Sequence, residues 1–355
     1  MNHRHRTLPV LFAILILFVL AGVLWRGYSQ RAISISAALP EKEAYWTQRI
    51  QAEGGKGAYG EFTRYAHVFT SEVQHQEAHI FGDALFDVEG LSGLSACDSR
   101  FSFGCFHAFI GRAIATLGLS VVRELDANCF RTLGPGLGIS CQHGIGHGVL
   151  AGVGYDDAAL RKALSVCKAL PSDDPVGGCY GGVFMEYNMR TMIEGGARAD
   201  AAHDLQYPCD AVDVEFRQTC YFYQPQWWLN LQHVTTGKDH VDFAAAGTLC
   251  DAAPTEPLIR SCYEGLGVMA PSEVDFEPAQ SARLCEQSSL DSVRRLYCTS
   301  YAANAFFDPA SKRDGMMVCE GLSGAYHTYC TEYATNRASL AKQLPSFIKN
   351  EPDAI

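Results

Sequence analysis

The chain lacks an excess of positive charge. It carries 28 lysine and arginine residues against 39 aspartate and glutamate residues, so its formal net charge is −11 at pH 7. General nucleic-acid binding needs a basic face that neutralises phosphates, and we therefore expect no nucleic-acid partner. The hydrophobic fraction of 48% and the charged fraction of 19% are those of a globular protein rather than a disordered one.

Several catalytic signatures are also absent from the sequence. Neither Gly-x-Ser-x-Gly nor His-Glu-x-x-His occurs, which removes the commonest hydrolase and zinc-protease signatures. The glycine-rich segment Gly134–Gly138 contains no lysine and has no strand context, so it does not indicate a phosphate-binding loop. Any catalytic site must therefore be found from other residue patterns.

The N-terminus carries one long uncharged run, from Leu8 to Trp25. This run of about 18 residues would span roughly 27 Å as a helix, close to the ~30 Å hydrocarbon core of a bilayer. It exceeds the about 7–15 apolar residues of a typical signal peptide, and the preceding Arg4 and Arg6 favour a cytoplasmic N-terminus. We predict a single-pass signal anchor that leaves the bulk of the chain in the periplasm or extracellular space. A signal peptide cleaved near Ser36 is the alternative and would give a secreted form.

The most informative residues are the 14 cysteines, because an even and high number in an oxidising compartment predicts disulfides. They fall into seven consecutive pairs whose members lie 8 to 13 positions apart, and successive pairs begin 32 to 42 positions apart. The pairs are Cys97/Cys105, Cys129/Cys141, Cys167/Cys179, Cys209/Cys220, Cys250/Cys262, Cys285/Cys298 and Cys319/Cys330. A period of this length is typical of α/α solenoids, in which each unit is a helical hairpin. Zinc sites are the alternative, but the wide and variable spacing fits a short Cys-x-x-Cys pattern poorly.

The residues around the pairs predict where each helix ends. The first cysteine closes an apolar helical stretch, as in Thr248-Leu249-Cys250, and the second opens a stretch of aromatic and small residues, as in Cys262-Tyr263. Each disulfide would connect the end of one helix to the start of the next. The architecture resembles that of Sel1-like and other tetratricopeptide-type arrays over roughly residues 97–337. We expect an all-α chain in which a transmembrane helix is followed by about seven α/α units, each closed by one disulfide.

The segments around the cysteines complete the predicted domain organisation. Residues 1–28 form a cytoplasmic flank and membrane anchor, 29–95 a helical cap, 96–340 the disulfide-clipped repeats, and 341–355 a polar tail. Within the cap we expect a short helix near Glu41–Glu53 and one long amphipathic helix from Tyr59 to Val88. The cap would shield the first repeat from solvent.

Histidines are concentrated before residue 150, and two pairs have the spacing His-x-x-x-His. His75 with His79, and His143 with His147, each place two imidazoles on one helix face, where they can bind one ion. His107 and His143 each follow the second cysteine of their unit by two positions. Equivalent positions of adjacent repeats lie side by side, so these two rings should be neighbours. We predict a metal site from these five histidines, holding either one ion or two ions that share the set, with the N-terminal helix packed against the first repeats.

The sequence does not select one metal or one reaction for this site. Imidazole suits copper, iron and zinc ions, and nearby carboxylates favour iron or zinc. Glu77 and Glu186 are the candidate catalytic proton acceptors. A polar interhelical cluster without metal, or unrelated surface histidines, are the alternatives. Met185 and Met269 are interpreted as core residues rather than copper ligands.

A cluster of aromatic residues lies further along the chain, at residues 221–228. Tyr223, Trp227 and Trp228 are candidates to line a groove for a ligand or peptide, although packing in the repeat core is the simpler interpretation. We predict a membrane-anchored extracytoplasmic metal-binding protein, and a metal-dependent oxidase or hydrolase is the activity such a site would support. The alternative is a non-catalytic scaffold that binds a protein or peptide on its concave surface beside the membrane.

Overall fold

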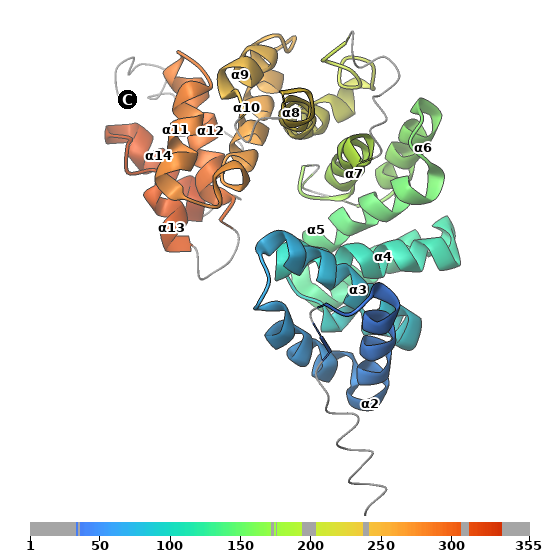
Figure 1. Ribbon diagram of the computed structural model, residues 1–355. Helices are drawn as coiled ribbons and strands as arrows, with labels where there is room; N and C mark the ends of the chain where they lie inside the picture. Colours follow the sequence, from blue (N-terminus) through green and yellow to red (C-terminus); the bar gives the residue numbers. More distant parts are fainter. Residues whose placement is uncertain are drawn as a thin grey trace, which may run out of the picture.

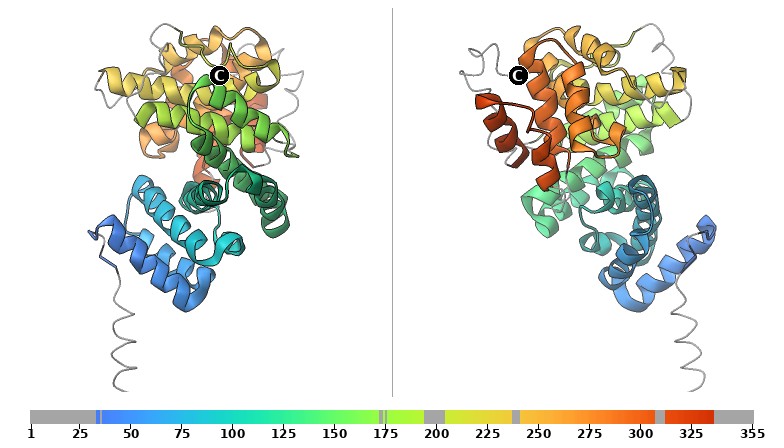
Figure 2. Two further views of the ribbon diagram at one scale, coloured as in Figure 1. Left: turned by 90° about the vertical axis from the view of Figure 1, so that its right-hand side faces the viewer. Right: turned by 60° about the vertical axis from the view of Figure 1, so that its left-hand side comes forward.

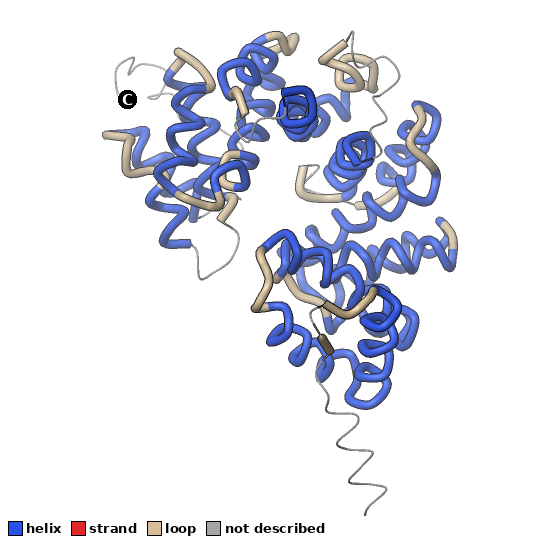
Figure 3. The backbone as a smooth tube through the Cα atoms, viewed as in Figure 1, coloured by secondary structure: helices blue, strands red, loops and turns tan. Residues whose placement is uncertain are grey.

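The computed structural model describes residues 33–34, 36–171, 174, 176–193, 204–236, 241–306 and 312–335. All regular elements of these residues are α-helices or 3-10 helices, and no strand occurs among them (Figure 3). The predicted all-α fold is therefore confirmed for this part of the chain. The predicted anchor at residues 8–25 and the tail 341–355 lie outside the described residues. Among the helices that are described, none is long and apolar enough to cross a membrane.

One series of helices runs through the whole molecule, and each member packs against the next. We call them the inner helices. They are α3 (Ser71–Glu89), α4 (Gly104–Leu117), α5 (Val122–Val153), α7 (Cys179–Ile193), α8 (Val214–Thr236), α10 (Glu256–Met269), α12 (Ser292–Asn304) and α14 (Gly324–Thr335). Figure 1 shows that they follow an arc. The further views place α2 and α3 at one end of this arc and the last helices at the other (Figure 2).

Shorter elements precede or connect the inner helices. The first helices of their units are η1 (Gly90–Ala96), α6 (Asp157–Lys168), α9 (Phe243–Asp251), α11 (Pro278–Gln287) and α13 (Lys312–Met317). The connecting 3-10 turns are η2 (Phe101–Phe103), η3 (Leu119–Val121) and η4 (Ser272–Val274). In the second unit both helices lie within α5, whose helical backbone is broken at Gly134 with a φ of 73°. This positive φ is readily adopted only by glycine.

All seven predicted disulfides are present, and this prediction is confirmed. They are Cys97/Cys105, Cys129/Cys141, Cys167/Cys179, Cys209/Cys220, Cys250/Cys262, Cys285/Cys298 and Cys319/Cys330. Their Cα–Cα distances lie between 5.3 and 5.8 Å, and no cysteine is more than 3% exposed. Each bridge closes one helical unit, so the described fold is a series of seven disulfide-clipped units. Seven buried disulfides indicate an oxidising, extracytoplasmic environment.

The second cysteine of most units does not stand at the start of its helix, and this part of the prediction is wrong. It holds only where Cys105 is the second residue of α4 and Cys179 is the first residue of α7. The second cysteines that lie inside a helix are Cys141, Cys220, Cys262, Cys298 and Cys330. In α12 a capping group begins the helix upstream of the cysteine, because the carboxylate of Asp291 accepts from the backbone amides of Val293 and Arg294. In these five units the bridge therefore reaches the second turn of the following helix rather than its start.

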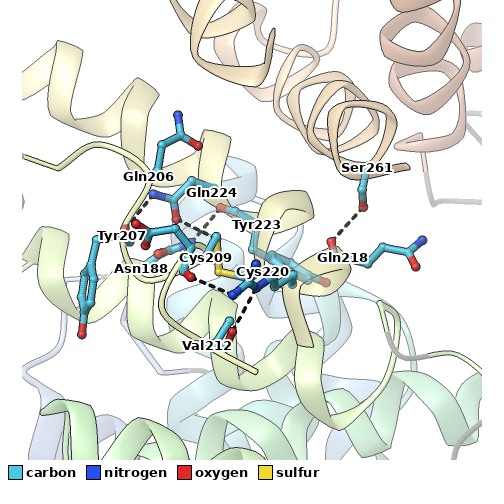
Figure 4. Close-up of a disulfide and its surroundings, with 12 residues drawn as sticks. Asn188, Gln206, Tyr207, Cys209, Val212, Gln218, Cys220, Tyr223, Gln224 and Ser261 are labelled. Atoms are coloured by element: carbon cyan, nitrogen blue, oxygen red, sulfur yellow. Dashed lines mark hydrogen bonds between the residues drawn. A yellow bond between two sulfur atoms is a disulfide. The ribbon is translucent and has the colours of Figure 1, made fainter. Parts of the chain in front are cut away.

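The fourth unit departs from the pattern because Cys209 lies in a turn before α8 rather than at the end of a described helix. Figure 4 shows how α8 holds this turn in place. The side-chain amide of Gln224 donates to the carbonyl oxygens of Leu205 and Tyr207, both at 3.0 Å. The guanidinium of Arg217 also donates to backbone carbonyls of the turn. Side chains thus satisfy backbone groups that a helix would have paired internally.

Adjacent inner helices approach so closely that side chains are excluded at their crossings. A Cβ added at Gly146 of α5 would lie 2.1 Å from the carbonyl oxygen of Cys179 on α7. A Cβ at Gly182 of α7 would lie 1.9 Å from the carbonyl oxygen of His143 on α5. Glycine permits this contact between backbones. The short separation brings side chains of successive inner helices within reach of one another.

The N-terminal helices differ from the prediction. The predicted continuous helix from Tyr59 to Val88 is wrong, because α2 (Leu39–Ala66) ends before α3 begins at Ser71. The turn between them is closed by a hydrogen bond from the amide of Phe69 to the carbonyl oxygen of Ala66, at 3.1 Å. Since α3 packs against α4 as the later inner helices pack together, it acts as the first inner helix.

Candidate metal centre

Three successive inner helices, α3, α4 and α5, carry the five histidines selected from the sequence. They form two triads, His75/His79/His107 and His107/His143/His147, within each of which one nitrogen per ring lies within 4.8 Å of the others. His107 belongs to both triads and joins them. Each group of three imidazoles could hold a metal ion, since three histidines are a sufficient protein ligand set for zinc.

The rings are in close contact along the whole cluster. The centroids of His75 and His79 lie 4.5 Å apart, and those of His143 and His147 lie 5.0 Å apart. His107 lies between the two pairs, with its centroid 5.5 Å from that of His75 and 4.7 Å from that of His147. The structure therefore brings all five predicted histidines together in one cluster across three helices.

Glycines at the helix crossings permit this arrangement. Gly104 begins α4 beside α3, where an added Cβ would lie 2.8 Å from the carbonyl oxygen of His75. On the other side, Gly146 lies between the two histidines of α5 and touches the backbone of α7. These glycines, which weaken an isolated helix, thus allow α4 to approach α3 and α5 to approach α7 at the cluster.

Acceptors outside the cluster orient two of the imidazoles. The Nδ1 of His147 donates to Oε2 of Glu186 on α7 at 2.9 Å, and Oε1 of Glu186 accepts from the hydroxyl of Tyr155 at 2.7 Å. The Nδ1 of His75 donates to the carbonyl oxygen of Phe101 at 2.8 Å. A neutral imidazole whose Nδ1 carries the proton has its lone pair on Nε2, and such bonding to a carboxylate or carbonyl is usual for metal-binding histidines.

Two ring nitrogens in the cluster have no hydrogen-bond partner. They are the Nε2 atoms of His79 and His147, one from each triad, and both are buried. Buried polar atoms are normally hydrogen-bonded, and an unsatisfied one costs about 1–3 kcal/mol. A metal ion bound by these lone pairs would remove that cost.

Burial favours the neutral form of four of the five histidines. It lowers the pKa of His79 to about 3, and repulsion from His75 contributes to the same shift. Burial is also the largest cause of the lowered pKa of His75, His107 and His143. Near neutral pH these rings therefore offer lone pairs rather than positive charge, as metal binding requires.

The two predicted carboxylates are not equivalent. Glu77 does not lie with the histidines: it pairs with Lys42 of α2 and accepts a hydrogen bond from the hydroxyl of Tyr65 at 3.1 Å. Its predicted role as proton acceptor at this site is therefore corrected, because two positions along a helix turn a side chain about 200° away from His75. Glu186 does contact the cluster, through the outer nitrogen of His147.

Of the three aromatic residues predicted to line a groove, only Tyr223 lines a cavity. Its ring centroid lies 5.9 Å from that of His143. Trp227 and Trp228 are 4% and 2% exposed, and the indole nitrogen of Trp228 donates to the carbonyl oxygen of Leu205 at 2.7 Å. These two tryptophans belong to the core, which was the simpler interpretation.

The rest of the cavity that Tyr223 lines was not predicted from the sequence. It has a volume of about 220 Å³, and His107 and His143 contribute to its wall together with residues of α7, α8, α10 and α12. Met185 is also in the wall, with its sulfur 3.4 Å from Nε2 of His143. Residues from several units form the wall, and of these only Tyr223, in the aromatic cluster, was predicted from the sequence to line a groove.

Comparison with known proteins gives no functional assignment for this chain. No protein-family model, curated protein or solved structure matches this chain. Histidine triads that could hold a metal ion are thus the main functional feature of the described residues.

Proposed function

We propose that the protein is an extracytoplasmic metalloprotein whose five-histidine cluster binds copper or zinc. The observation that carries this proposal is the pair of buried, unpartnered Nε2 atoms of His79 and His147, one in each triad. A polar cluster that served only packing would pair these nitrogens with hydrogen-bond partners. Metal coordination accounts for both the missing partners and the convergence of five rings.

The donor set supports the choice of metal. Carboxylates favoured iron or zinc in the sequence-based prediction, but Glu77 faces α2, and Glu186 bonds to the outer nitrogen of His147. The remaining ligands are neutral imidazoles, which suit zinc and copper. The thioether of Met185 beside His143 is a soft donor of the kind that favours copper(I).

The shared ring limits how many ions bind tightly. A neutral imidazole has one lone pair, so His107 can serve one triad at a time. The triad with His143 and His147 has two advantages. Glu186 fixes His147 and increases its basicity, and the adjoining cavity leaves room for a further ligand. We therefore expect one tightly bound ion in this triad and weaker metal binding at His75 and His79, where Nε2 of His79 offers its lone pair.

A metal held by three histidines beside a cavity retains an open coordination position, which can bind and activate water or dioxygen. A metal-dependent hydrolase or oxidase is the activity that such a site supports, and Glu186 remains the candidate proton acceptor. We also retain the proposals of a membrane anchor at residues 8–25 and of a protein or peptide partner on the concave side. A scaffold without metal is the alternative function.

Elemental analysis tests the proposal. The full-length chain, purified without a polyhistidine tag, is loaded with copper or zinc and separated from excess metal by gel filtration. We expect stoichiometric metal in the wild type and its loss in His107→Ala and His147→Ala. His233→Ala is the matched control, because His233 on α8 lies outside both triads and bonds to Glu273 at 2.8 Å.

Two results would count against the proposal. A wild-type chain that retains no stoichiometric metal would contradict it and leave the scaffold as the better function. Equal metal retention in the wild type and His107→Ala would show that the ion binds elsewhere.

A further inference from the structure

We propose that the cavity beside His107 and His143 binds a small phenolic molecule, mainly apolar and carrying one hydrogen-bond donor. This inference rests on the proposed metal site, because it assigns the class of ligand that would lie next to the ion. The two histidines belong both to the second triad and to the cavity wall. A molecule in the cavity would therefore lie beside a metal held by that triad.

The wall excludes charged ligands. Its main surface comes from apolar side chains on three inner helices, including Met185 on α7, Phe222 on α8, and Val268 and Met269 on α10. Among the described residues, no aspartate, glutamate, lysine or arginine lines it. A charged ligand would lose its hydration here without gaining an ion pair from any side chain of the wall, whereas an apolar one gains from leaving water.

The size and the aromatic wall favour a single ring. The volume of about 220 Å³ is below the roughly 300 Å³ at which sites for drug-sized ligands begin. Tyr223 lies against His143 at one side, with ring centroids 5.9 Å apart, and Tyr301 also contributes to the wall. Aromatic side chains interact favourably with another ring in stacked or edge-to-face arrangements.

One residue of this wall, Gln226, can select for a hydrogen-bond donor. Its side-chain oxygen Oε1 is buried and has no hydrogen-bond partner. An amide oxygen can only accept, so a hydroxyl on the ligand would satisfy it once the Gln226 side chain turns this oxygen toward the cavity. The hydroxyl of Tyr223 cannot fill this role, since it donates to the carbonyl oxygen of Val176 at 3.0 Å. A phenol combines the ring and the donor that the cavity requires.

Binding of two probes tests the cavity without depending on the metal. 4-Methylphenol and toluene differ only in the hydroxyl, and their affinities for the metal-free full-length chain are measured by ligand-observed NMR. We expect the wild type to prefer 4-methylphenol by roughly tenfold, the effect of one buried hydrogen bond. Gln226→Met, which removes the acceptor at similar size, should abolish this preference and still bind both probes.

A second pair of variants tests the location. Val268→Phe adds volume within the cavity and should weaken 4-methylphenol binding by about tenfold or more. Val234→Phe is the matched control, because Val234 on α8 is 70% exposed and does not line the cavity. Equal binding by the wild type and Val268→Phe, or an unchanged preference in Gln226→Met, would overturn the assignment.

Paramagnetic relaxation tests whether a ligand in the cavity lies next to the metal. Protons of 4-methylphenol should relax faster with the copper(II)-loaded chain than with the zinc-loaded chain, because bound probe lies next to the ion. Cavity binding without this enhancement in a chain that holds stoichiometric copper would refute the inference and leave the metal proposal intact. If the chain takes up no metal, the metal proposal is wrong. Probe binding by the same chain then shows separately whether the cavity exists as described.

Discussion

The substitution Gly146→Ala tests the close contact between α5 and α7 that places Glu186 beside His147. Gly146 lies on α5 between His143 and His147. An added Cβ would lie 2.1 Å from the carbonyl oxygen of Cys179 and 2.7 Å from the amide nitrogen of Val183, both backbone atoms of α7. Ordinary contact begins at 3.4 Å, so α5 and α7 must separate by roughly 1 Å.

Both stability and metal affinity should decrease. Overpacking costs about 1–3 kcal/mol, and the upper part of this range applies because backbone atoms cannot rotate away. Alanine returns about 1 kcal/mol of helix propensity, which leaves a net loss of ~2 kcal/mol. The same displacement would stretch the 2.9 Å bond between His147 and Glu186 beyond hydrogen-bonding range. Loss of such an outer partner typically weakens metal binding about 10–100-fold.

Two measurements check this prediction. Denaturant unfolding of the metal-free chain gives the change in stability, and competition with a chromophoric chelator gives the change in metal affinity. The control is Gly111→Ala on α4, where an added Cβ meets nothing within 4 Å, so we expect unchanged or slightly higher stability. Wild-type stability together with wild-type metal affinity in Gly146→Ala would refute the reasoning.

Three further predictions concern separate features of the fold. Glu186→Ala should weaken metal binding about 10–100-fold in the same competition assay, because His147 loses its outer acceptor; unchanged affinity would argue against this orienting role. Burial raises the pKa of Asp83 from 3.8 to about 6, so the folded state holds this proton more tightly and stability decreases as pH rises through that interval. Asp83→Asn should therefore stabilise the chain at pH 7.5 by ~1 kcal/mol, after allowance for partial solvent screening, and have little effect at pH 4. Unfolding curves at the two pH values test this, and an equal effect at both would contradict it. Replacing Cys250 and Cys262 together by serine should cost ~3 kcal/mol in unfolding experiments without reductant, given their separation of 12 positions; an unchanged midpoint would show that this bridge adds no stability.

The sequence was sufficient for features that depend on short-range spacing. The interval between Cys250 and Cys262 fits one helical hairpin, and similar intervals recur along the chain, so all seven bridges could be predicted. His143 and His147 share a helix face for the same local reason, since four positions are about one turn. His107 and His143 occupy equivalent positions in adjacent units, so their rings were predicted to be neighbours, and their centroids lie 6.1 Å apart.

Features that depend on how helices face each other were not predicted correctly. Glu77 was grouped with His75 by proximity in sequence, although the histidines face α4 and the carboxylate faces α2. The break between α2 and α3 arises from a local turn that the apolar periodicity does not reveal. The cavity with Gln226 in its wall depends on the curvature of the array, which is set by contacts between helices from several units.

X-ray absorption at the copper or zinc edge tests the central claim most directly, namely that the histidines around His107 hold the ion. The loaded wild-type chain should show nitrogen ligands at about 2.0 Å with the multiple scattering of imidazole rings. His107→Ala should lose this signal. A first coordination shell dominated by oxygen, or an imidazole signal that is unchanged in His107→Ala, would contradict the claim.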